Sequence, residues 1–246
     1  MVVEGKVWAV ARFAAVAFDL FETLATEFLP DWRPGPSTAE RLGVPQQCYA
    51  ELWRARKHER MTGTVDYRDV LRQMCTAADV VIDRQVEETI ETLYAERLAA
   101  KARPLQQVDD RLLQALDQLR ARGLRLAVIS NCSGEEVMGW EASPLAPMFD
   151  EVAFSYWEGV AKPDQRIYLT ACNRLGVQPE QVAFVGDGGS HELDGACRAG
   201  LTPYCARWFL DCWPATYQKR RADAVRGFPA VGTPEELLRA LGGDHR

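Results

Sequence analysis

The sequence predicts an α/β protein built on a doubly wound, Rossmann-like parallel sheet. Short apolar runs of strand length, rich in Val, Ala, Ile and Phe, alternate with segments of helical periodicity. Strands that alternate with helices in this way form parallel sheets with helices on both faces. The expected strands are residues 14–18, 124–129, 151–154, 182–186 and 201–206.

Four segments between or after these strands carry apolar side chains at spacings of three and four, the period of an amphipathic helix. In the first of them, four leucines between residues 112 and 119 follow this spacing, and Gly123 is a typical helix end. The predicted helices are residues 109–123, 163–176, 191–200 and 233–241.

Residues 28–103 interrupt the alternation, because this segment has no convincing strand and shows several helical patterns. Pro45 suits the first turn of a helix, and residues 82–101 carry apolar side chains at helical spacing. We expect an inserted, all-helical cap of residues 28–103 on a core made of residues 8–27 and 104–246. Because it follows the first strand, the cap would lie over the carboxyl edge of the sheet and could close on a substrate.

Composition limits the class of protein. The 246 residues are 47% hydrophobic and 26% charged, which is typical of a soluble globular chain. A net charge of -6 argues against a nucleic-acid partner, and no apolar stretch approaches the roughly 20 residues that cross a bilayer. The seven cysteines show no CxxC spacing, so we expect reduced thiols in a cytoplasmic protein. A monomer and a homodimer are both compatible with the sequence.

Polar residues follow several of the expected strands. Asp19 comes directly after the first strand, Ser130 and Asn131 after the second, and Asp187 after the fourth. Lys162 lies in the loop that follows the third. In an open parallel sheet, ligands bind beyond the carboxyl ends of the strands, so these residues can converge on one site.

These motifs resemble those of the haloacid dehalogenase (HAD) superfamily. The shared pattern is a strand ending in DxxxT, a later strand ending in Ser-Asn, a lysine in a KPD context, and a strand ending in GD before a second acid. The four motifs occur in the right order, from about residue 14 to residue 206. The helical insertion after the first motif resembles the C1-type cap of that superfamily.

The resemblance implies a hydrolase and gives each motif residue a role. Asp19 would be the nucleophile, whose carboxylate forms a covalent ester or acyl phosphate with the substrate. Thr23 and Ser130 would donate hydrogen bonds to phosphate oxygens, and Asn131 would orient the nucleophile or the substrate. Lys162 would neutralise the negative charge of nucleophile and substrate.

A Mg²⁺ cofactor is also implied. A carboxylate at Asp187 close to Asp19 is unfavourable unless a cation holds both, and Mg²⁺ prefers oxygen ligands. The implied ligands are Asp19, the backbone carbonyl of Phe21, Asp187 and a second acid. Glu192, five residues after Asp187, is favoured as this acid, with Asp194 as the alternative.

Phe21 is the main departure from the pattern of HAD phosphatases, which usually carry an acid there to protonate the leaving group. The 2-haloacid dehalogenases also lack this acid, and the run KPDQRIY resembles theirs, which makes Tyr168 a candidate contact to the substrate. A dehalogenase needs no metal, however, and usually replaces the acid that Asp187 retains here. The residues that could replace the missing acid are Glu22, Glu158 and His191.

The cap offers a hint about the substrate. The basic residues of LWRARKHERM share one helical face with Trp53, at spacings of three, four and seven. We expect this face to bind a small anionic substrate, although a solvated basic face is also compatible. The basic residues are Arg56, Lys57 and Arg60, and further pocket candidates are Tyr67, Trp32 and Trp157.

Three functions fit these observations. The favoured one is a Mg²⁺-dependent phosphatase that acts on a small phosphorylated metabolite through Asp19. The alternatives are a metal-independent hydrolase of the 2-haloacid dehalogenase type and a catalytically weak binding or regulatory protein. The identity of the substrate stays open, because the cap loops decide it.

Overall fold

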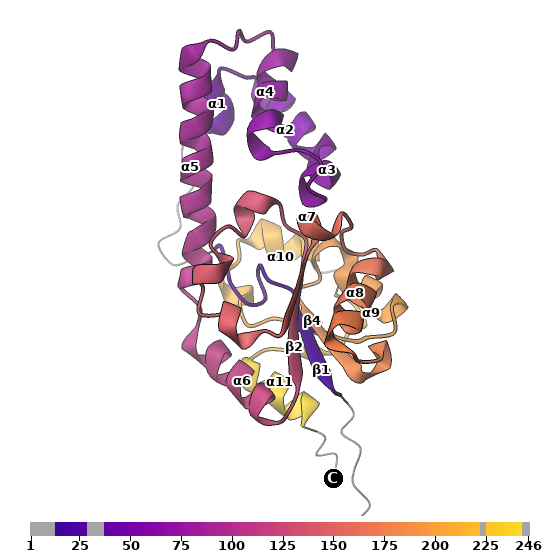
Figure 1. The fold of residues 1–246 in the computed structure, drawn as a ribbon. Coiled ribbons are helices and arrows are strands. Elements are labelled where there is room, and N and C mark those ends of the chain that lie inside the picture. The colour runs from indigo at the N-terminus through magenta and orange to yellow at the C-terminus, as the bar shows by residue number, and fades with distance from the viewer. Residues whose placement is uncertain (1–12, 29–36, 222–224, 243–246) are drawn as a thin grey trace, which may run out of the picture.

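The computed structural model describes residues 13–28, 37–221 and 225–242, which form a six-stranded parallel sheet with helices on both faces (Figure 1). The strand order is β3-β2-β1-β4-β5-β6. The strands are β1 (Ala15–Phe18), β2 (Arg125–Ser130), β3 (Glu151–Phe154), β4 (Val182–Gly186), β5 (Thr202–Ala206) and β6 (Ala230–Val231). The predicted doubly wound class is confirmed, and the five predicted strands agree with the structure to within one residue at each end. The short β6 was not predicted, because two residues are too few to show a pattern.

Helices cover both faces of the sheet (Figure 1). Helices α6 (Asp110–Ala121) and α11 (Pro234–Leu241) pack on one face, and α8 (Gln165–Leu175) and α9 (Glu192–Arg198) pack on the other. Alternation along the strands explains this arrangement, because successive side chains point to opposite faces. Val16 and Phe18 therefore join the α6 side of the core, whereas Ala15 and Ala17 meet the α8 side.

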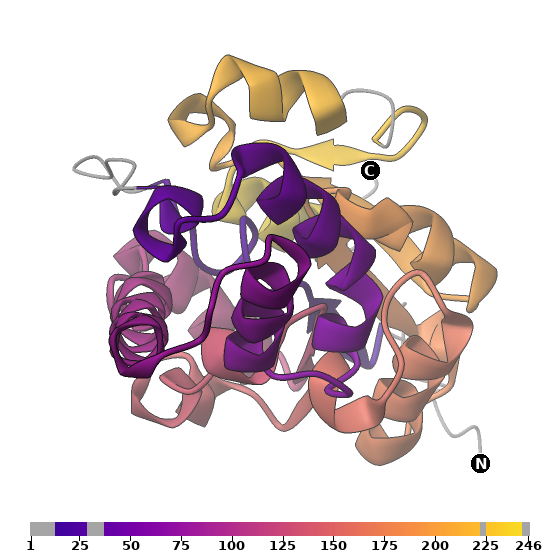
Figure 2. The same cartoon turned by 90° about the horizontal axis from the view of Figure 1, so that it is seen from above.

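Residues 37–106, which lie between β1 and α6, are mainly helical and form a lobe with its own helices. Its helices are α1 (Thr38–Leu42), α2 (Gln46–Ala55), α3 (Lys57–Met61), α4 (Tyr67–Ala77) and α5 (Arg84–Gln106). This lobe has a hydrophobic core of its own, with Leu71, Met74 and Ile90 completely buried. Figure 2 looks down on the lobe and shows its helices above the core.

Two details of this cap differ from the simple expectation. The helical pattern of residues 45–61 is divided into α2 and α3 by Arg56, whose ψ of 8° departs from helical geometry. The predicted boundary between residues 103 and 104 falls inside α5, which continues to Gln106 and buries Leu105 in the main core. The division into cap and core at that boundary stays a prediction.

The remaining elements are short. They are α7 (Ser155–Glu158), α10 (Ala215–Arg221) and the 3₁₀ turns η1 (Gly134–Glu136), η2 (Trp140–Ala142), η3 (Ala146–Met148), η4 (Pro179–Gln181), η5 (Gly189–His191) and η6 (Leu210–Cys212). Within the described ranges, none of the helices has the length and apolar character that a membrane span requires.

A buried ion-pair network fixes α5 to the core. Arg97 bonds to Glu135 at 2.8 Å and to Glu136 at 2.9 Å, and Lys101 lies 2.8 Å from Glu136 and 2.5 Å from Glu27. Burial would raise the pKa of Glu136, but Lys101 and Arg97 outweigh that effect and hold it at about 2. The network joins the cap to η1 and to the loop after β1.

Replacing Glu136 with Gln should lower the free energy of unfolding by about 3 kcal/mol at pH 7, because it leaves two buried cations with one partner fewer. The deficit should shrink as the pH falls from 4.5, the ordinary value for glutamate, towards 2. In that range the unfolded chain binds a proton at Glu136 that the folded protein does not bind, so the contribution of the carboxylate to stability is lost progressively. Denaturant unfolding at several pH values measures both effects.

The matched control is Glu88→Gln, which breaks the exposed pair with Arg84. Such surface pairs contribute little, so the change should stay below about 0.5 kcal/mol. Equal losses in the two variants would show that the Glu136 network does not fix the cap.

Candidate active site

Asp19 and Asp187 lie side by side at the carboxyl edge of the sheet. They directly follow β1 and β4, which are neighbouring strands with Phe18 paired to Val185. The backbone N–H of Asp19 extends this pairing, since it donates to the carbonyl of Val185 at 2.8 Å. The strand order reverses between β1 and β4, and open α/β sheets bind their ligands at such a point.

Lys162 connects the acidic residues of this edge. Its Nζ lies 2.5 Å from Oδ1 of Asp19 and 2.5 Å from Oε2 of Glu192. Burial would lower the pKa of Lys162, but the two carboxylates outweigh it and raise the pKa. The ammonium group is therefore charged at neutral pH and supplies a fixed cation next to the predicted nucleophile.

Asn131 holds the backbone of Lys162 in place. The Nδ2 group of Asn131 donates to the Lys162 carbonyl at 2.8 Å, and the Lys162 N–H donates to Oδ1 of Asn131 at 2.7 Å. This pair of bonds ties the end of β2 to the loop before α8. The predicted Asn131 thus contributes to the site by positioning Lys162.

Tyr168 does not line the site. Its side chain is completely buried against the ring of Phe184, and its hydroxyl donates to the carbonyl of Glu192 at 2.8 Å. Gly195 permits this contact, because a Cβ there would lie 2.6 Å from the hydroxyl oxygen. The structure therefore gives Tyr168 a role in positioning Glu192, in place of the substrate contact expected from the sequence.

Three carboxylates form a buried cluster that suits a metal ion. Asp19, Asp187 and Glu192 each place one oxygen within 4.8 Å of the others, and all three residues are buried. Mg²⁺ takes such hard oxygen ligands. The chemistry of this donor set therefore fits the implied Mg²⁺.

The two predicted second acids occupy different positions. Glu192 is within the cluster, with Oε2 bonded to Lys162 and Oε1 accepting from the N–H of Gly188 at 3.0 Å. Asp194 is half-exposed and faces His191, 3.7 Å away. Because both oxygens of Glu192 are engaged, Asp19 and Asp187 are the more available ligands, and Glu192 holds Lys162.

The hydroxyl groups of Thr23 and Ser130 are buried in the same region. Neither oxygen has a hydrogen-bond partner among the residues that the structure describes. A buried hydroxyl without a partner costs about 1–3 kcal/mol. Since buried polar groups are nearly always paired, these two are candidates to donate to the oxygens of a bound ligand.

Of the residues that could replace the missing acid, Glu22 is the most unusual. Burial raises its pKa to about 7, and its φ of 64° lies in the left-handed region. Both carboxylate oxygens are occupied, because Oε2 accepts from Thr26 and Trp213 and Oε1 accepts from the N–H of Glu27. In this structure Glu22 therefore organises the loop after β1.

The other two candidates lie away from the cluster. Glu158 forms an ion pair with Arg174 at 2.7 Å, which joins α7 to α8. The His191 side chain is 73% exposed. Phe21 itself is partly buried, and its ring lies 5.1 Å from Nζ of Lys101.

The three basic residues predicted to bind substrate have different environments. Arg60 is buried and stacks on the ring of Trp53, whereas Arg56 pairs with Glu59 at 2.9 Å. Lys57 is exposed and lines a pocket of about 610 Å³ between cap and core, together with Arg60.

The aromatic candidates contribute mainly to packing. Tyr67 is buried in the cap against Trp53, and Trp157 packs on Phe154. Trp32 lies outside the described residues. The thiol of Cys132 is buried, which raises its pKa well above the ordinary value, so it is not a poised nucleophile.

Two tryptophans that the sequence analysis missed hold the loop after β1. The indole N–H of Trp208 donates to the Thr23 carbonyl at 2.8 Å, and that of Trp213 donates to Glu22 at 2.7 Å. The only signal in the sequence is that two tryptophans lie close together soon after β5.

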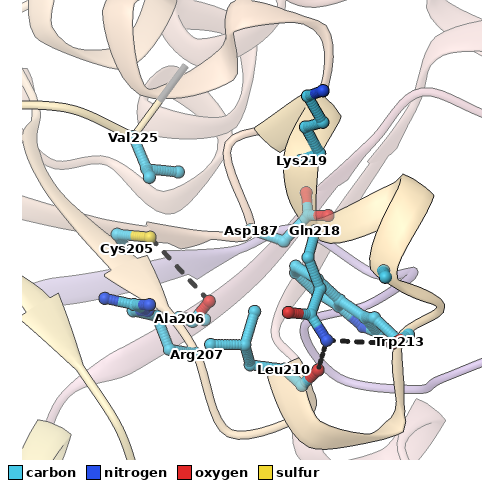
Figure 3. A pocket seen from close by; sticks show the side chains of 10 residues that line it. Asp187, Cys205, Ala206, Arg207, Leu210, Trp213, Gln218, Lys219 and Val225 are labelled. Carbon is cyan, nitrogen blue, oxygen red and sulfur yellow. Dashed lines mark hydrogen bonds between the residues drawn. The ribbon is translucent and has the colours of Figure 1, made fainter. Parts of the chain in front are cut away.

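A pocket of about 400 Å³ opens beside these tryptophans, between the segment after β5 and Asp187 (Figure 3). It borders the carboxylate cluster, because Asp187 is part of its lining. Its lining comprises Asp187, Cys205, Ala206, Arg207, Leu210, Trp213, Ala215, Gln218, Lys219 and Val225.

Comparison with known proteins identifies the class. The family model of haloacid dehalogenase-like hydrolases matches residues 13–200, so the chain belongs to this family of hydrolases. The family resemblance read from the four motifs is thereby confirmed.

Curated relatives include both phosphatases and dehalogenases. Glyceraldehyde 3-phosphate phosphatase of Methanopyrus kandleri is 38% identical over 132 residues, which cover 52% of this chain and 53% of the relative. (S)-2-haloacid dehalogenase 4A of Burkholderia cepacia is 28% identical over 197 residues, which cover 76% of this chain and 80% of the relative. The chain thus spans about half the length of the archaeal phosphatase that it matches.

Solved structures show the same fold. The 2-haloacid dehalogenase of Pseudomonas syringae has a TM-score of 0.63 at 22% identity, covering 94% of this chain and 98% of that one. The HAD phosphatase of Thermococcus onnurineus has a TM-score of 0.54 at 23% identity, covering 95% of this chain and all of that one. At these identities the likeness concerns the fold alone.

Thr23→Val should leave the stability of the protein unchanged or slightly higher, because it removes a buried hydroxyl without a partner and keeps the shape. It should weaken the binding of inorganic phosphate about 10-fold or more, the size of one hydrogen bond to a charged group. Thermal unfolding and calorimetric titration with phosphate measure the two effects.

Thr26→Val is the matched control, since the Thr26 hydroxyl donates to Glu22 at 2.7 Å. This variant should be less stable, by about 1–3 kcal/mol, and should bind phosphate like the wild type once folded. The assignment of Thr23 fails if its substitution destabilises the protein and spares phosphate binding.

Proposed function

We propose that this chain is a Mg²⁺-dependent phosphatase that hydrolyses a small phosphorylated metabolite, with Asp19 as the nucleophile. The observation that carries the proposal is the acid at Asp187, which the sequence retains and the fold places beside Asp19 in a buried carboxylate cluster. The unpartnered hydroxyls of Thr23 and Ser130 support it, because a phosphoryl group offers the acceptor oxygens that they lack. Relatives named as phosphatases agree with it.

The residues suggest a two-step reaction. A carboxylate oxygen of Asp19 attacks phosphorus, the bond from phosphorus to the ester oxygen breaks, and an acyl phosphate forms. Water then releases phosphate and regenerates the Asp19 carboxylate. Lys162 offsets the negative charge shared by nucleophile and substrate, while Thr23 and Ser130 donate to the phosphoryl oxygens.

Mg²⁺ would be held by Asp19, Asp187 and the backbone carbonyl of Phe21. When bound, it would supply positive charge next to the transferring phosphoryl group. Glu192 keeps the ammonium group of Lys162 oriented toward Asp19. The nucleophile would therefore have a fixed positive charge beside it in addition to the metal ion.

Phe21 supports the second candidate, a hydrolase of 2-haloacids. There, Asp19 would attack the carbon that bears the halogen, halide would leave, and water would hydrolyse the resulting ester. A departing halide needs no proton, so an apolar residue at position 21 is no disadvantage. The Burkholderia relative, matched over most of its length, is named as such an enzyme.

Phosphate release from a panel of small phosphate esters, with and without Mg²⁺, tests the proposal. Turnover should require Mg²⁺ and should be lost in Asp19→Asn, because an amide of nearly the same shape is a poor nucleophile. Chloride release from 2-chloropropionate without metal would identify the dehalogenase instead. If Asp19→Asn changes neither activity nor any property of the protein in cells, the chain is a binding or regulatory member of the family.

Asp187→Asn should abolish detectable Mg²⁺ binding while the fold remains intact. The amide can still accept the 2.8 Å bond from the Gly189 N–H, but it removes a charge from the metal site. Calorimetric titration of wild type and variant with Mg²⁺ measures the difference. Equal affinities in the two proteins would contradict the metal site and favour the dehalogenase.

Phe21→Asp should increase phosphatase turnover, because it restores a proton donor worth typically 10² to 10⁴ in rate. The gain should be largest for alkyl phosphates, whose basic leaving groups need a proton, and small for aryl phosphates. Steady-state rates with the two substrate types measure it. A folded, Mg²⁺-binding variant that is no faster than wild type would show that another residue already transfers the proton, or that phosphate transfer is not the reaction.

A further inference from the structure

Arg60 differs from the other buried cations of the cap. It is 3% exposed, yet within the described part of the chain it forms no salt bridge. Arg97 and Lys101 are also largely buried, but each has two carboxylate partners. A guanidinium group cannot shed its proton in a protein, so a buried one without a salt bridge is costly. Burial and the nearby Arg97 lower the pKa of Arg60, and the longer-range attraction of Glu136 and Glu135 does not outweigh them.

The orientation of the Arg60 guanidinium is fixed by its contacts. Its plane centre lies 3.4 Å from the centroid of the Trp53 ring, and Nη2 donates to the Trp53 carbonyl at 3.3 Å. The buried Nε has no hydrogen-bond partner among the described residues. Stacking on Trp53 thus holds the guanidinium group in place, and its remaining N–H groups are available to donate hydrogen bonds to a ligand.

The pocket that Arg60 lines borders the core at Glu136 of η1. Lys101 is on the same pocket wall as Glu136, and its Nζ lies 5.1 Å from the ring of Phe21, two residues after Asp19. Met61, the residue after Arg60, also lines this pocket. A molecule in this pocket can therefore contact both Arg60 and Lys101, and the ammonium group of Lys101 lies beside Phe21.

Met61 also anchors this wall to the core. Its carbonyl accepts from the hydroxyl of Ser155 at 2.5 Å, and that hydroxyl in turn accepts from the N–H of Cys132 at 3.0 Å. Cys132 follows Ser130 by two residues. Hydrogen bonds thus connect Met61, next to Arg60, to the loop that directly follows Ser130 at the end of β2.

We infer that Arg60 is the receptor for a second anionic group on the substrate, so that the preferred substrates are phosphate esters whose alcohol part ends in a carboxylate or a second phosphate. The inference rests on the proposed phosphatase function and adds the substrate class. The reacting phosphoryl group lies at Asp19, and the far anion accepts hydrogen bonds from the Arg60 guanidinium. Among the basic residues of the cap helices, Arg60 is thereby the one that determines specificity.

The test compares three phosphate esters of equal chain length, ending in a carboxylate, a phosphate or a neutral carboxamide. Wild-type kcat/KM should be about 10- to 100-fold higher for an anionic end than for the carboxamide, the size of one hydrogen bond between charged groups. The carboxylate and phosphate esters show which anion is preferred. Arg60→Met should abolish the preference, so that the ratio of kcat/KM for an anionic ester to kcat/KM for the carboxamide ester falls to about 1.

Two further variants control for changes in folding. Arg60→Lys keeps the charge without the planar fork and should retain part of the preference. Arg84→Met makes the same substitution at an exposed cap arginine outside the pocket and should retain all of it. A wild type without preference, or a preference that survives in Arg60→Met, overturns the inference.

Binding measured without turnover separates this inference from the proposed function. The Asp19→Asn protein should bind the preferred anionic ester without hydrolysing it, so its dissociation constant can be measured. The double variant Asp19→Asn, Arg60→Met should bind the same ester with a dissociation constant about 10-fold higher or more. If the wild type releases phosphate from none of the esters, the phosphatase proposal fails, while this titration still tests Arg60. An unchanged dissociation constant rejects the role of Arg60.

Discussion

The ammonium group of Lys162 is the contact on which the site depends. It bonds to Asp19 at the end of β1 and to Glu192 at the start of α9, and its backbone is held by Asn131 at the end of β2. Three separate parts of the chain are thereby held at one point. Without this cation, two buried carboxylates would face each other at a cost that burial makes large. The relative positions of Asp19, Glu192 and Asn131 therefore depend on their contacts with Lys162.

Satisfied and unsatisfied groups are distributed unevenly around this point. The ion pairs of Arg97 and Lys101 are complete, and they hold the cap to the core. By contrast, the hydroxyls of Thr23 and Ser130 and the Nε of Arg60 have no partner among the described residues. If stability were the only requirement, we would expect such buried polar groups to be hydrogen-bonded or replaced by apolar ones. These groups are therefore candidates to donate hydrogen bonds to a ligand, with Thr23 and Ser130 near the carboxyl edge of the sheet and Arg60 in the pocket that the cap helices line.

The sheet and the motif residues could be predicted because each depends on local sequence. The strands are short apolar runs, and Asp19 and Asp187 follow directly from where those runs end. The environment of Tyr168 could not be predicted, since its burial depends on Gly195, a residue 27 positions later that makes room for its hydroxyl. The same limit applies to Arg60, whose missing partner is a property of the tertiary structure.

The segment after β5 shows a second limit of sequence reasoning. No motif marks Trp208 or Trp213, and the helical periodicity of residues 215–221 is too short to indicate a function. Their indole groups reach back nearly 200 positions to the loop after β1. Contacts over such separations are set by the closure of the fold, which strand and helix patterns do not encode.

The region that the family model matches is smaller than the part of the chain that holds the loop after β1 in place. The family match ends at residue 200, but the loop that carries Thr23 and Glu22 is hydrogen-bonded to Trp208 and Trp213 beyond that point. A fragment trimmed to the shared region would keep the four motifs and still expose the Glu22 carboxylate on the side that Trp213 covers. A chimaera made from two relatives would therefore need to take the loop after β1 and the segment that contains Trp208 and Trp213 from the same parent.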